Sequence, residues 1–368
     1  MSGGVDSAVA ALLLLEQGYR VQGLFMSNWE EDDDGYCTSA QDFQDARRVC
    51  EELEIPLHKV NFAAEYRAEV FEQFLAEHRL GRTPNPDVLC NRQIKFGTCF
   101  AYARRLGAER FATGHYARIH TTSSGYRLLK GIDAGKDQSY FLHGIDPAVL
   151  PYTLFPLGNL TKQEVRRRAH DSALPVFDKR DSTGICFIGE RPFQSFLSQY
   201  LPAQPGAIET PEGHVIGRHQ GLMYYTLGQR HGIGIGGIAG GPEEPWYVAA
   251  KDQDRNVLIV VQGRDHPLLL SNSFRTGPIH WLAPPAGERT LGCSVRVRYR
   301  QADQPCTLVW DADSAHVSLE APQRAITPGQ SAVFYDGETC LGGAVISHIA
   351  STARCAGDHA APARRMSI

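Results

Sequence analysis

Two patterns of apolar residues alternate through the first third of the chain: helical spacing in some segments and short strand-like runs in others. The apolar run Ala8–Gln17 predicts a buried helix that ends at Gly18, a residue that commonly terminates helices. The pattern then predicts strands at Val21–Met26 and Leu57–Phe62, with a helix that begins at Ser39 between them. Strands that alternate with helices predict an α/β domain built on a doubly wound parallel sheet.

The same alternation continues further along the chain. It predicts a helix at Glu65–His78, a second at about 91–106, and a strand at Phe111–Gly114. A hairpin is expected at Ala117–Ile132, and a basic helix at Thr161–Ser172. Because ligands of such sheets bind beyond the carboxyl ends of the strands, the chemistry is expected there.

Short β segments and Gly/Pro turns dominate the second half. They predict a small mixed β-rich domain at 195–272 and a C-terminal antiparallel β-barrel at 273–350. The α/β domain then spans 1–194, and the small, polar tail at 351–368 is expected to be disordered.

Composition limits the classes of protein that fit. The 368 residues are 42% hydrophobic with a net charge of -4, and no apolar run is long enough to cross a bilayer. Nine cysteines, an odd number without any C-x-x-C, and no secretory signal at Met1 predict reduced thiols in the cytoplasm and no resident metal site. Nothing in the net charge predicts a nucleic-acid partner, so such a surface has to be local.

A glycine-rich stretch precedes the first helix. It consists of Ser2, Gly3, Gly4, Val5, Asp6 and Ser7. Two glycines and a following helix N-terminus form a favourable phosphate site, and the alternative is a glycine turn that only caps a buried helix. A loop of this kind normally follows a strand, and almost nothing precedes it here, so the sheet is expected to lack its first strand. The loop is expected close to Met26 and Gly114.

Two of the nine cysteines have a context that favours reactivity. Cys90 follows the proline-rich segment Thr83–Asp87 at a predicted helix start, with Arg92 and Lys95 one turn on. Cys186 lies between glycines on a loop, after Lys179 and Arg180. A helix N-terminus and nearby cations favour the thiolate, although a packing role is equally compatible with the sequence.

Several short motifs occur in a fixed order. They are Ser2–Ser7, Asn28–Glu30, Thr83–Asn91, Ala112–Tyr116, Gly135–Tyr140, Asp181–Glu190, His219–Gly221, Leu227–Arg230 and Pro328–Gln330. Together they resemble the bacterial tRNA-specific 2-thiouridylase family, within the PP-loop ATP pyrophosphatases, from residue 1 to about 350. Alternatives are another PP-loop adenylating ligase and a non-catalytic tRNA- or nucleotide-binding protein.

The resemblance implies an ATP-dependent transferase that thiolates the wobble uridine (position 34) of tRNA. ATP would bind Ser2–Ser7, Met26 and Gly114, with Mg²⁺ on the phosphates. By resemblance, Cys186 carries the persulfide and Cys90 is the partner nucleophile, and the two end as a disulfide. Asp87 is a candidate acid–base residue, with an Asx-turn role as the alternative.

The resemblance also implies partners. The tRNA is expected to contact Asn85, Pro86, Asp87, Lys136, Asp137, Gln138, Arg298 and Tyr299. The alternation of Arg296, Arg298 and Arg300 with apolar residues predicts one basic strand face, which is either an RNA surface or a solvated one. Lys, Glu and Gln isoacceptors are the expected tRNAs, and a cysteine desulfurase or relay carrier the expected sulfur source.

Overall fold

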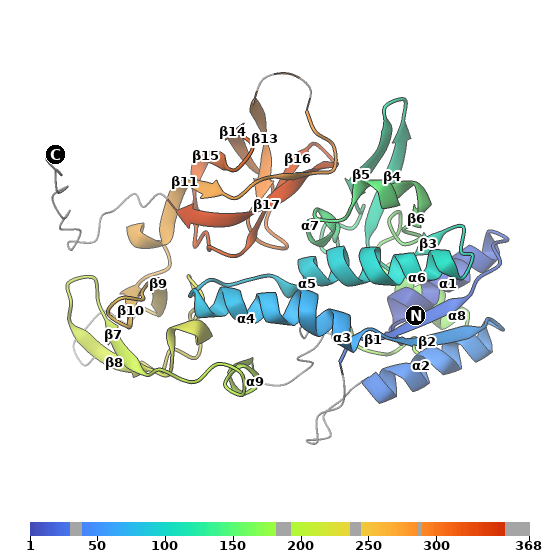
Figure 1. Ribbon diagram of the computed structural model, residues 1–368, viewed down its shortest axis with the longest axis horizontal. Coiled ribbons are helices and arrows are strands. Elements are labelled where there is room, and N and C mark those ends of the chain that lie inside the picture. The colour runs from blue at the N-terminus through green and yellow to red at the C-terminus, as the bar shows by residue number, and fades with distance from the viewer. Residues whose placement is uncertain (30–38, 182–192, 236–243, 286, 288, 350–368) are drawn as a thin grey trace, which may run out of the picture.

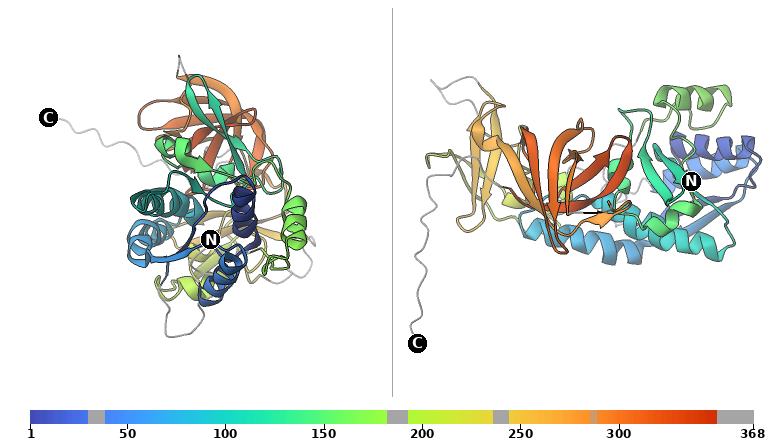
Figure 2. Two further views of the ribbon diagram at one scale, coloured as in Figure 1. Left: turned by 90° about the vertical axis from the view of Figure 1, so that its right-hand side faces the viewer. Right: turned by 90° about the horizontal axis from the view of Figure 1, so that it is seen from above.

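The computed structural model describes residues 1–29, 39–181, 193–235, 244–285, 287 and 289–349. The α/β region, the C-terminal barrel and a smaller β region follow one another along the long axis (Figure 2). This arrangement confirms the predicted order of an α/β part followed by β-rich parts, and both β-rich parts contact the α/β region.

The α/β region contains most of the helices, and its parallel strands pair in two separate sheets. β1 (Gly23–Ser27) pairs with β2 (Leu57–Asn61), and β3 (Phe111–Ala112) pairs with β6 (Thr153–Leu154). Helices α1 (Val5–Glu16), α2 (Ser39–Glu52) and α8 (Lys162–Asp171) pack around these strands (Figure 1). The parallel pairing is as predicted, but no described strand joins the two pairs into one sheet.

Two long helical runs lie side by side in opposite directions under the barrel (Figure 1). The first is made of α3 (Ala63–Tyr66), the π-helical segment η1 (Arg67–Phe71) and α4 (Glu72–Arg79). The second is made of α5 (Pro86–Leu89), the π-helical segment η2 (Cys90–Cys99) and α6 (Phe100–Arg105). Their contact places the start of the second run at the centre of the molecule.

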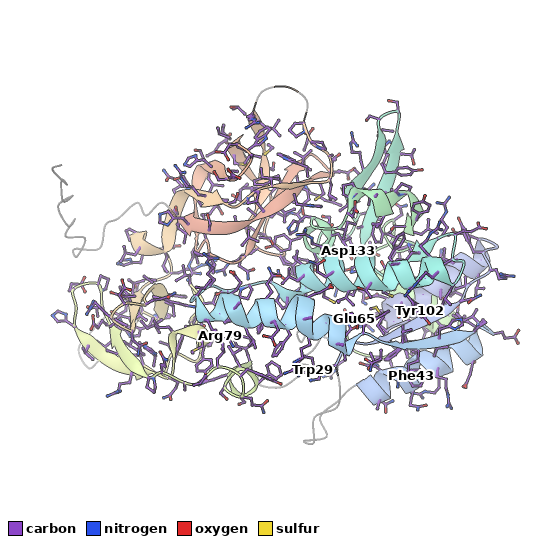
Figure 3. All side chains as sticks on the ribbon, viewed as in Figure 1. Trp29, Phe43, Glu65, Arg79, Tyr102 and Asp133 are labelled. Atoms are coloured by element: carbon purple, nitrogen blue, oxygen red, sulfur yellow. The ribbon has the colours of Figure 1, made fainter. Side chains whose placement is uncertain are left out.

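An aromatic cluster anchors the first run. The Trp29 ring, which Figure 3 labels below the helices, lies 4.9 Å from the Phe71 ring and 6.3 Å from the Phe196 ring, both edge-on. Phe196 comes from α9 (Phe193–Leu197), so the cluster joins the α/β region to the smaller β region. Edge-to-face rings of this kind add specific packing energy to the area they bury.

The barrel closes because its first and last strands meet. Six antiparallel strands follow one another around it: β11 (Leu270–Thr276), β15 (Ala315–Arg324), β14 (Gln304–Trp310), β13 (Thr290–Arg296), β16 (Ser331–Asp336) and β17 (Thr339–Ile349). β17 pairs with β11, and β12 (His280–Trp281) also pairs with β17. Closure removes the exposed strand edges.

The predicted hairpin is present and extends the barrel sheet. It is formed by β4 (Ala117–Thr122) and β5 (Gly125–Lys130), and Leu129 pairs with Thr339 of β17. The sheet therefore runs from the barrel into the α/β region, which fixes the two against each other. Nothing in the hairpin's own pattern indicated this partner.

The smaller β region has a four-stranded sheet in the order β8, β7, β10, β9. Its strands are β7 (Gly206–Glu209), β8 (Val215–His219), β9 (Trp246–Asp252) and β10 (Val257–Gln262). Short helical segments complete the described fold: α7 (Ser139–Leu142), η3 (Pro147–Tyr152), η4 (Leu222–Tyr224) and η5 (Pro267–Leu269).

His143, which follows α7, is buried where the α/β region meets the barrel. A Cβ on Gly343 of β17 would lie 2.5 Å from the ring of His143, and Nδ1 of this histidine donates to the Tyr140 carbonyl at 2.7 Å. Burial lowers the pKa of His143 to about 4, and His280 and Arg92 lower it further against that hydrogen bond. The histidine is therefore neutral at pH 7.

Folding stability is expected to fall as the pH drops from about 6.5 towards 4. The folded pKa of His143 lies below the unfolded value of about 6.5, so acid favours the unfolded chain. The His143→Asn variant keeps a side-chain N–H donor but cannot titrate. Between pH 7 and pH 5 its free energy of unfolding should therefore fall by on the order of 2 kcal/mol less than that of the unsubstituted chain. Urea titrations at both pH values measure this, with exposed His120→Asn as control; equal losses in both variants would contradict it.

Candidate active site

A tight turn at residues 2–7 leads into α1. The Ser2 and Ser7 hydroxyls lie 3.1 Å apart, and the Ser7 hydroxyl donates to the Gly4 carbonyl at 3.0 Å. Gly3 has a φ of +73°, and a Cβ there would lie 2.2 Å from the Asp42 carbonyl oxygen, so only glycine fits. The turn thus places backbone N–H groups at the start of a 12-residue helix, which favours phosphate binding.

Gly114 packs directly against this turn. A Cβ on Gly114 would lie 2.9 Å from the Asp6 carbonyl carbon and 3.0 Å from the Ser7 nitrogen. The expected proximity of Gly114 and the loop is therefore confirmed, and it explains why this position is glycine. Met26 is the penultimate residue of β1, opposite Val60 of β2.

Two lysines from distant segments reach the same turn. Lys162, at the start of α8, donates to Asp6 Oδ1 at 2.7 Å, and the Tyr116 hydroxyl donates to the same oxygen at 2.8 Å. Lys179 donates to the Gly3 carbonyl at 3.0 Å. No pattern in the sequence indicated that either lysine reaches this turn. Both ammonium groups lie beside the predicted phosphate site, where Lys179 also pairs with Asp42 and Asp45.

Asp181 gathers the surrounding cations. Its carboxylate accepts from Lys136 at 2.7 Å, and Lys162 and Arg166 lie 2.8 and 2.9 Å from it. Burial alone would raise the pKa of Asp181, but the hydrogen bonds from Lys136 and Lys162 prevail and lower it to about 2. Asp181 is thus a carboxylate at neutral pH, and Lys136 lies in this cluster.

Cys90 lies one turn inside its helix, not at the start as predicted. The Asn85 side chain caps the helix by accepting from the Asp87 and Val88 nitrogens at 3.2 and 3.4 Å, and Pro86 occupies the first helical position. An Asn–Pro pair is a strong start signal, so the helix begins before Cys90. Cys90 is 1% exposed.

The neighbours of Cys90 join three elements. Asn91 donates to the carbonyl of Phe141 in α7 at 3.1 Å, and the Asn91 Oδ1 is buried with no partner among the described residues. Burial raises the pKa of Asp87, and Lys95, about two turns further along the helix, opposes this. A carboxyl group with a raised pKa is suited to exchange protons.

The barrel holds the loop that precedes Asn85. The Thr83 nitrogen donates to the Pro328 carbonyl at 3.0 Å, and the Gln330 side chain donates to the Thr83 carbonyl at 2.8 Å. A Cβ on Gly329 would come within 2.8 Å of the Thr83 nitrogen. The motif Pro328–Gln330, which belongs to the barrel, therefore positions the helix that carries Cys90 in the α/β region.

Asp137 and Gln138 bind groups within the chain. Asp137 is 3% exposed and accepts from Gly131 and Ser139 nitrogens at 3.0 and 3.1 Å and from Arg296 at 2.7 Å. Gln138 accepts from the Tyr116 nitrogen at 3.0 Å. Both side chains shape the segment that carries Lys136.

The predicted basic strand ends early. β13 stops at Arg296, and the chain then turns, with Arg300 at a φ of +62°. Arg298 therefore does not lie on a solvated strand face; it donates to the Leu227 and Ala325 carbonyls, both at 2.9 Å. Tyr299 lies 4.5 Å from the Phe141 ring, which brings it close to the surroundings of Cys90. The structure thus brings the predicted residues into two groups, one at the turn and one at the Cys90 helix.

Three domain families match consecutive parts of the chain. They are the tRNA methyl transferase HUP domain (residues 1–190), the tRNA methyl transferase PRC-barrel domain (194–262) and the aminomethyltransferase beta-barrel domain (271–346). The tRNA-specific 2-thiouridylase MnmA of Chromohalobacter salexigens is 58% identical over 365 residues, which cover 98% of this chain and 94% of that protein. The chain belongs to the tRNA-specific 2-thiouridylase family. The enzymes of that name from Stutzerimonas stutzeri and Methylococcus capsulatus are both 59% identical and cover 94% of this chain, and 92% and 94% of their own lengths.

The 2-thiouridylase name extends over nearly the whole length, whereas the methyl transferase descriptions belong to single domains. A solved structure, NMN synthetase from Francisella tularensis, matches with a TM-score of 0.31 at 24% identity, over 50% of this chain and 64% of that one, which is too weak to carry an argument.

Cys186, the second cysteine expected in this 2-thiouridylase, lies outside the described residues, as do 351–368. Of the helices that the structure describes, none has the length and apolarity needed to span a bilayer. Within the described part of the chain, no three His, Cys, Asp or Glu side chains gather as a metal site.

Proposed function

We propose that this protein transfers sulfur to C2 of the wobble uridine (position 34) of tRNA in an ATP-dependent reaction. The observation that carries the proposal is that one α/β region holds both a cation-flanked phosphate turn and the capped helix of Cys90. A turn of this kind activates a substrate with ATP, and a cysteine in a shielded site acts as a nucleophile. Full-length similarity to 2-thiouridylases supports the combination.

The phosphates of ATP would lie on residues 2–7, with Met26 and Gly114 on the two neighbouring segments. Lys162 and Lys179 would neutralise the phosphates, because both already lie at the turn. The Asp6 carboxylate fits Mg²⁺, which typically takes one or two carboxylates together with substrate phosphates. When bound, Mg²⁺ would stabilise charge on the leaving pyrophosphate.

Sulfur transfer needs two steps. Uridine O2 attacks the α-phosphorus of ATP and releases pyrophosphate, which makes AMP the leaving group on C2. The terminal sulfur of a Cys186 persulfide would then attack C2 and displace AMP, which leaves C2 joined to Cys186 through an S–S bond. The Cys90 thiolate would attack Cys186 Sγ and break that bond, so that a Cys90–Cys186 disulfide forms and the sulfur stays on C2 as 2-thiouridine. A thiol reductant restores both cysteines. Asp87, with its raised pKa, would exchange protons near the base.

The tRNA would enter between the Cys90 helix and the barrel. Asn85, Pro86 and Asp87 lie where this helix begins, and Tyr299 lies beside Phe141 close to it. A splayed base is commonly stacked on an aromatic ring and read along its edges. The internal bonds of Lys136, Asp137 and Gln138 suggest that they support this surface as well as contact RNA.

Arg298 is proposed to contact a tRNA phosphate, and the salt dependence of binding tests this. Arg298→Ala should weaken tRNA binding and reduce the slope of log affinity against log salt by about 0.7 to 0.9. Arg324→Ala is the matched control, because Arg324 also holds the Gly228 carbonyl from the barrel. An unchanged slope in Arg298→Ala would show that Arg298 does not contact a tRNA phosphate and only holds carbonyl groups of the protein.

Incubation with ATP, a persulfide donor and unmodified tRNA tests the whole proposal. Formation of 2-thiouridine and AMP supports it. AMP without thiouridine would favour another adenylating ligase, and tRNA binding without AMP a non-catalytic binder. A cysteine desulfurase and a relay carrier are the donors to compare, with Lys, Glu and Gln isoacceptors as substrates in a cytoplasmic setting.

A further inference from the structure

We propose that Cys293 and Cys306 form a reversible disulfide site in the barrel, with a small-molecule disulfide as oxidant. Cys293 lies on β13 and Cys306 lies directly opposite it on β14. Their sulfur atoms are 3.7 Å apart. This pair is separate from the active-site cysteines and does not depend on the proposed function.

The strand register places the pair within reach of a disulfide. Directly opposed residues of an antiparallel pair have Cα atoms about 4.5 to 5.5 Å apart, and disulfides bridge about 4.4 to 6.8 Å. The sulfurs must approach by about 1.7 Å to reach the bonded distance of about 2.05 Å, which a small side-chain rotation achieves. The backbone of the barrel can therefore stay in place.

The two thiols differ in a way that gives each a role. Cys306 is 5% exposed and belongs to the barrel core, whereas Cys293 is half-buried at the edge of that core. The hydrogen bond from Cys306 lowers the pKa of Cys293, while Cys306 itself has a raised pKa because it donates that bond and is buried. Cys293 is thus the more exposed and more acidic of the two thiols, and Cys306 is the second thiol that resolves the first adduct.

Cys99 and Cys340, two other buried cysteines, do not share this low pKa. Burial raises the pKa of Cys99 and of Cys340 to about 12, which leaves almost no thiolate at neutral pH. Cys340 also lies in the barrel region, on β17, and is fully buried. It therefore serves as a matched control.

The reaction balances with glutathione disulfide as the oxidant. The Cys293 thiolate attacks one glutathione sulfur, which forms a mixed disulfide and releases one glutathione thiolate. Cys306 then loses its proton and attacks Cys293 Sγ, which forms the Cys293–Cys306 bond and releases the second glutathione. Two electrons pass from the two cysteines to glutathione disulfide, and the two thiol protons end on the released glutathione.

Oxidation would pin the strands next to an important contact. Arg296 lies three residues after Cys293 on β13 and binds Asp137 of the α/β region. A cross-link between positions 13 apart restricts the unfolded chain, so the oxidised barrel should unfold at a higher temperature. The site thereby links the redox state of the surroundings to the stability of the barrel.

Peptide mapping of the full chain after incubation with glutathione disulfide tests the proposal. Trypsin cuts after Arg296 and Arg300, so the two cysteines fall in separate peptides, Thr290–Arg296 and Gln301–Arg324. We expect the two peptides to be recovered as one disulfide-linked species that a thiol reductant separates. We also expect an increase in the thermal midpoint of the oxidised chain.

Two variants make the result decisive. Cys306→Ser should trap the Cys293–glutathione adduct and show no linked peptide, and Cys340→Ser should form the link as the natural chain does. The proposal is overturned if the natural chain accumulates the Cys293 adduct as Cys306→Ser does. It is equally overturned if both thiols stay reduced over a range of glutathione ratios in which other protein disulfides form.

Discussion

Replacement of Cys90 by alanine is expected to abolish 2-thiouridine formation, with a rate at least about 10³-fold lower. The side chain is 1% exposed on a helix capped by Asn85, in a position where a nucleophile is shielded from water. Pyrophosphate release from ATP and tRNA should continue, because adenylation of the uridine takes place at the turn formed by residues 2–7. Nucleoside analysis of the tRNA measures sulfur transfer, and a pyrophosphate assay measures activation separately.

Cys99→Ala is the matched control for this prediction. Cys99 lies on the same helical run, is 2% exposed, and has a pKa raised to about 12 by burial. Both substitutions remove a buried sulfur from the same helix, so they share the cost in packing. Thiolation by Cys90→Ala at the rate of Cys99→Ala would show that Cys90 is not the nucleophile. Cys186→Ala should also lose thiolation, because it lacks the persulfide.

Local patterns in the sequence predicted the elements well where one face is buried. Helix α1, the hairpin and the barrel strands follow from periodicity and turn residues. The start of the Cys90 helix was misplaced although its signal was present. Asn85 caps the helix and Pro86 is its first residue, and this start signal prevails although the segment was interpreted as a proline-rich loop.

Contacts between distant segments could not be predicted from such patterns. Lys162 is 156 positions from Asp6, and Lys179 is 176 positions from Gly3. A lysine at a helix start looks like any solvated charge until the fold brings a carboxylate to it. The sequence therefore indicated the phosphate turn itself but not the cations that flank it.

The basic stretch around Arg298 shows a different limit. Alternation of basic and apolar residues predicts a strand with one solvated face, but it holds only while the backbone stays extended. Here the chain turns after Arg296, and the Val297 nitrogen donates to the Gln301 side chain at 2.8 Å. The turn directs Arg298 to the Leu227 carbonyl of the smaller β region, 71 residues away in the sequence.

Lys162→Met is expected to reduce ATP-dependent AMP release by on the order of 10² to 10³-fold. Lys162 is 12% exposed and donates to Asp6 at the turn, so its charge acts in a shielded place beside the phosphates. Its removal should leave the local fold in place. Asp181 keeps Lys136 and Arg166, and Asp6 keeps the Tyr116 hydroxyl.

Lys59→Met controls for the loss of a lysine, because Lys59 is exposed on β2 and packs over the Phe43 ring. AMP release at saturating ATP, the KM for ATP and tRNA affinity should be measured for both variants. We expect tRNA affinity to stay unchanged in both and AMP release to fall only in Lys162→Met. Equal AMP release by the two variants would mean that Lys162 serves only to hold Asp6 and Asp181 together, and that the charge at the phosphates comes from Lys179 alone.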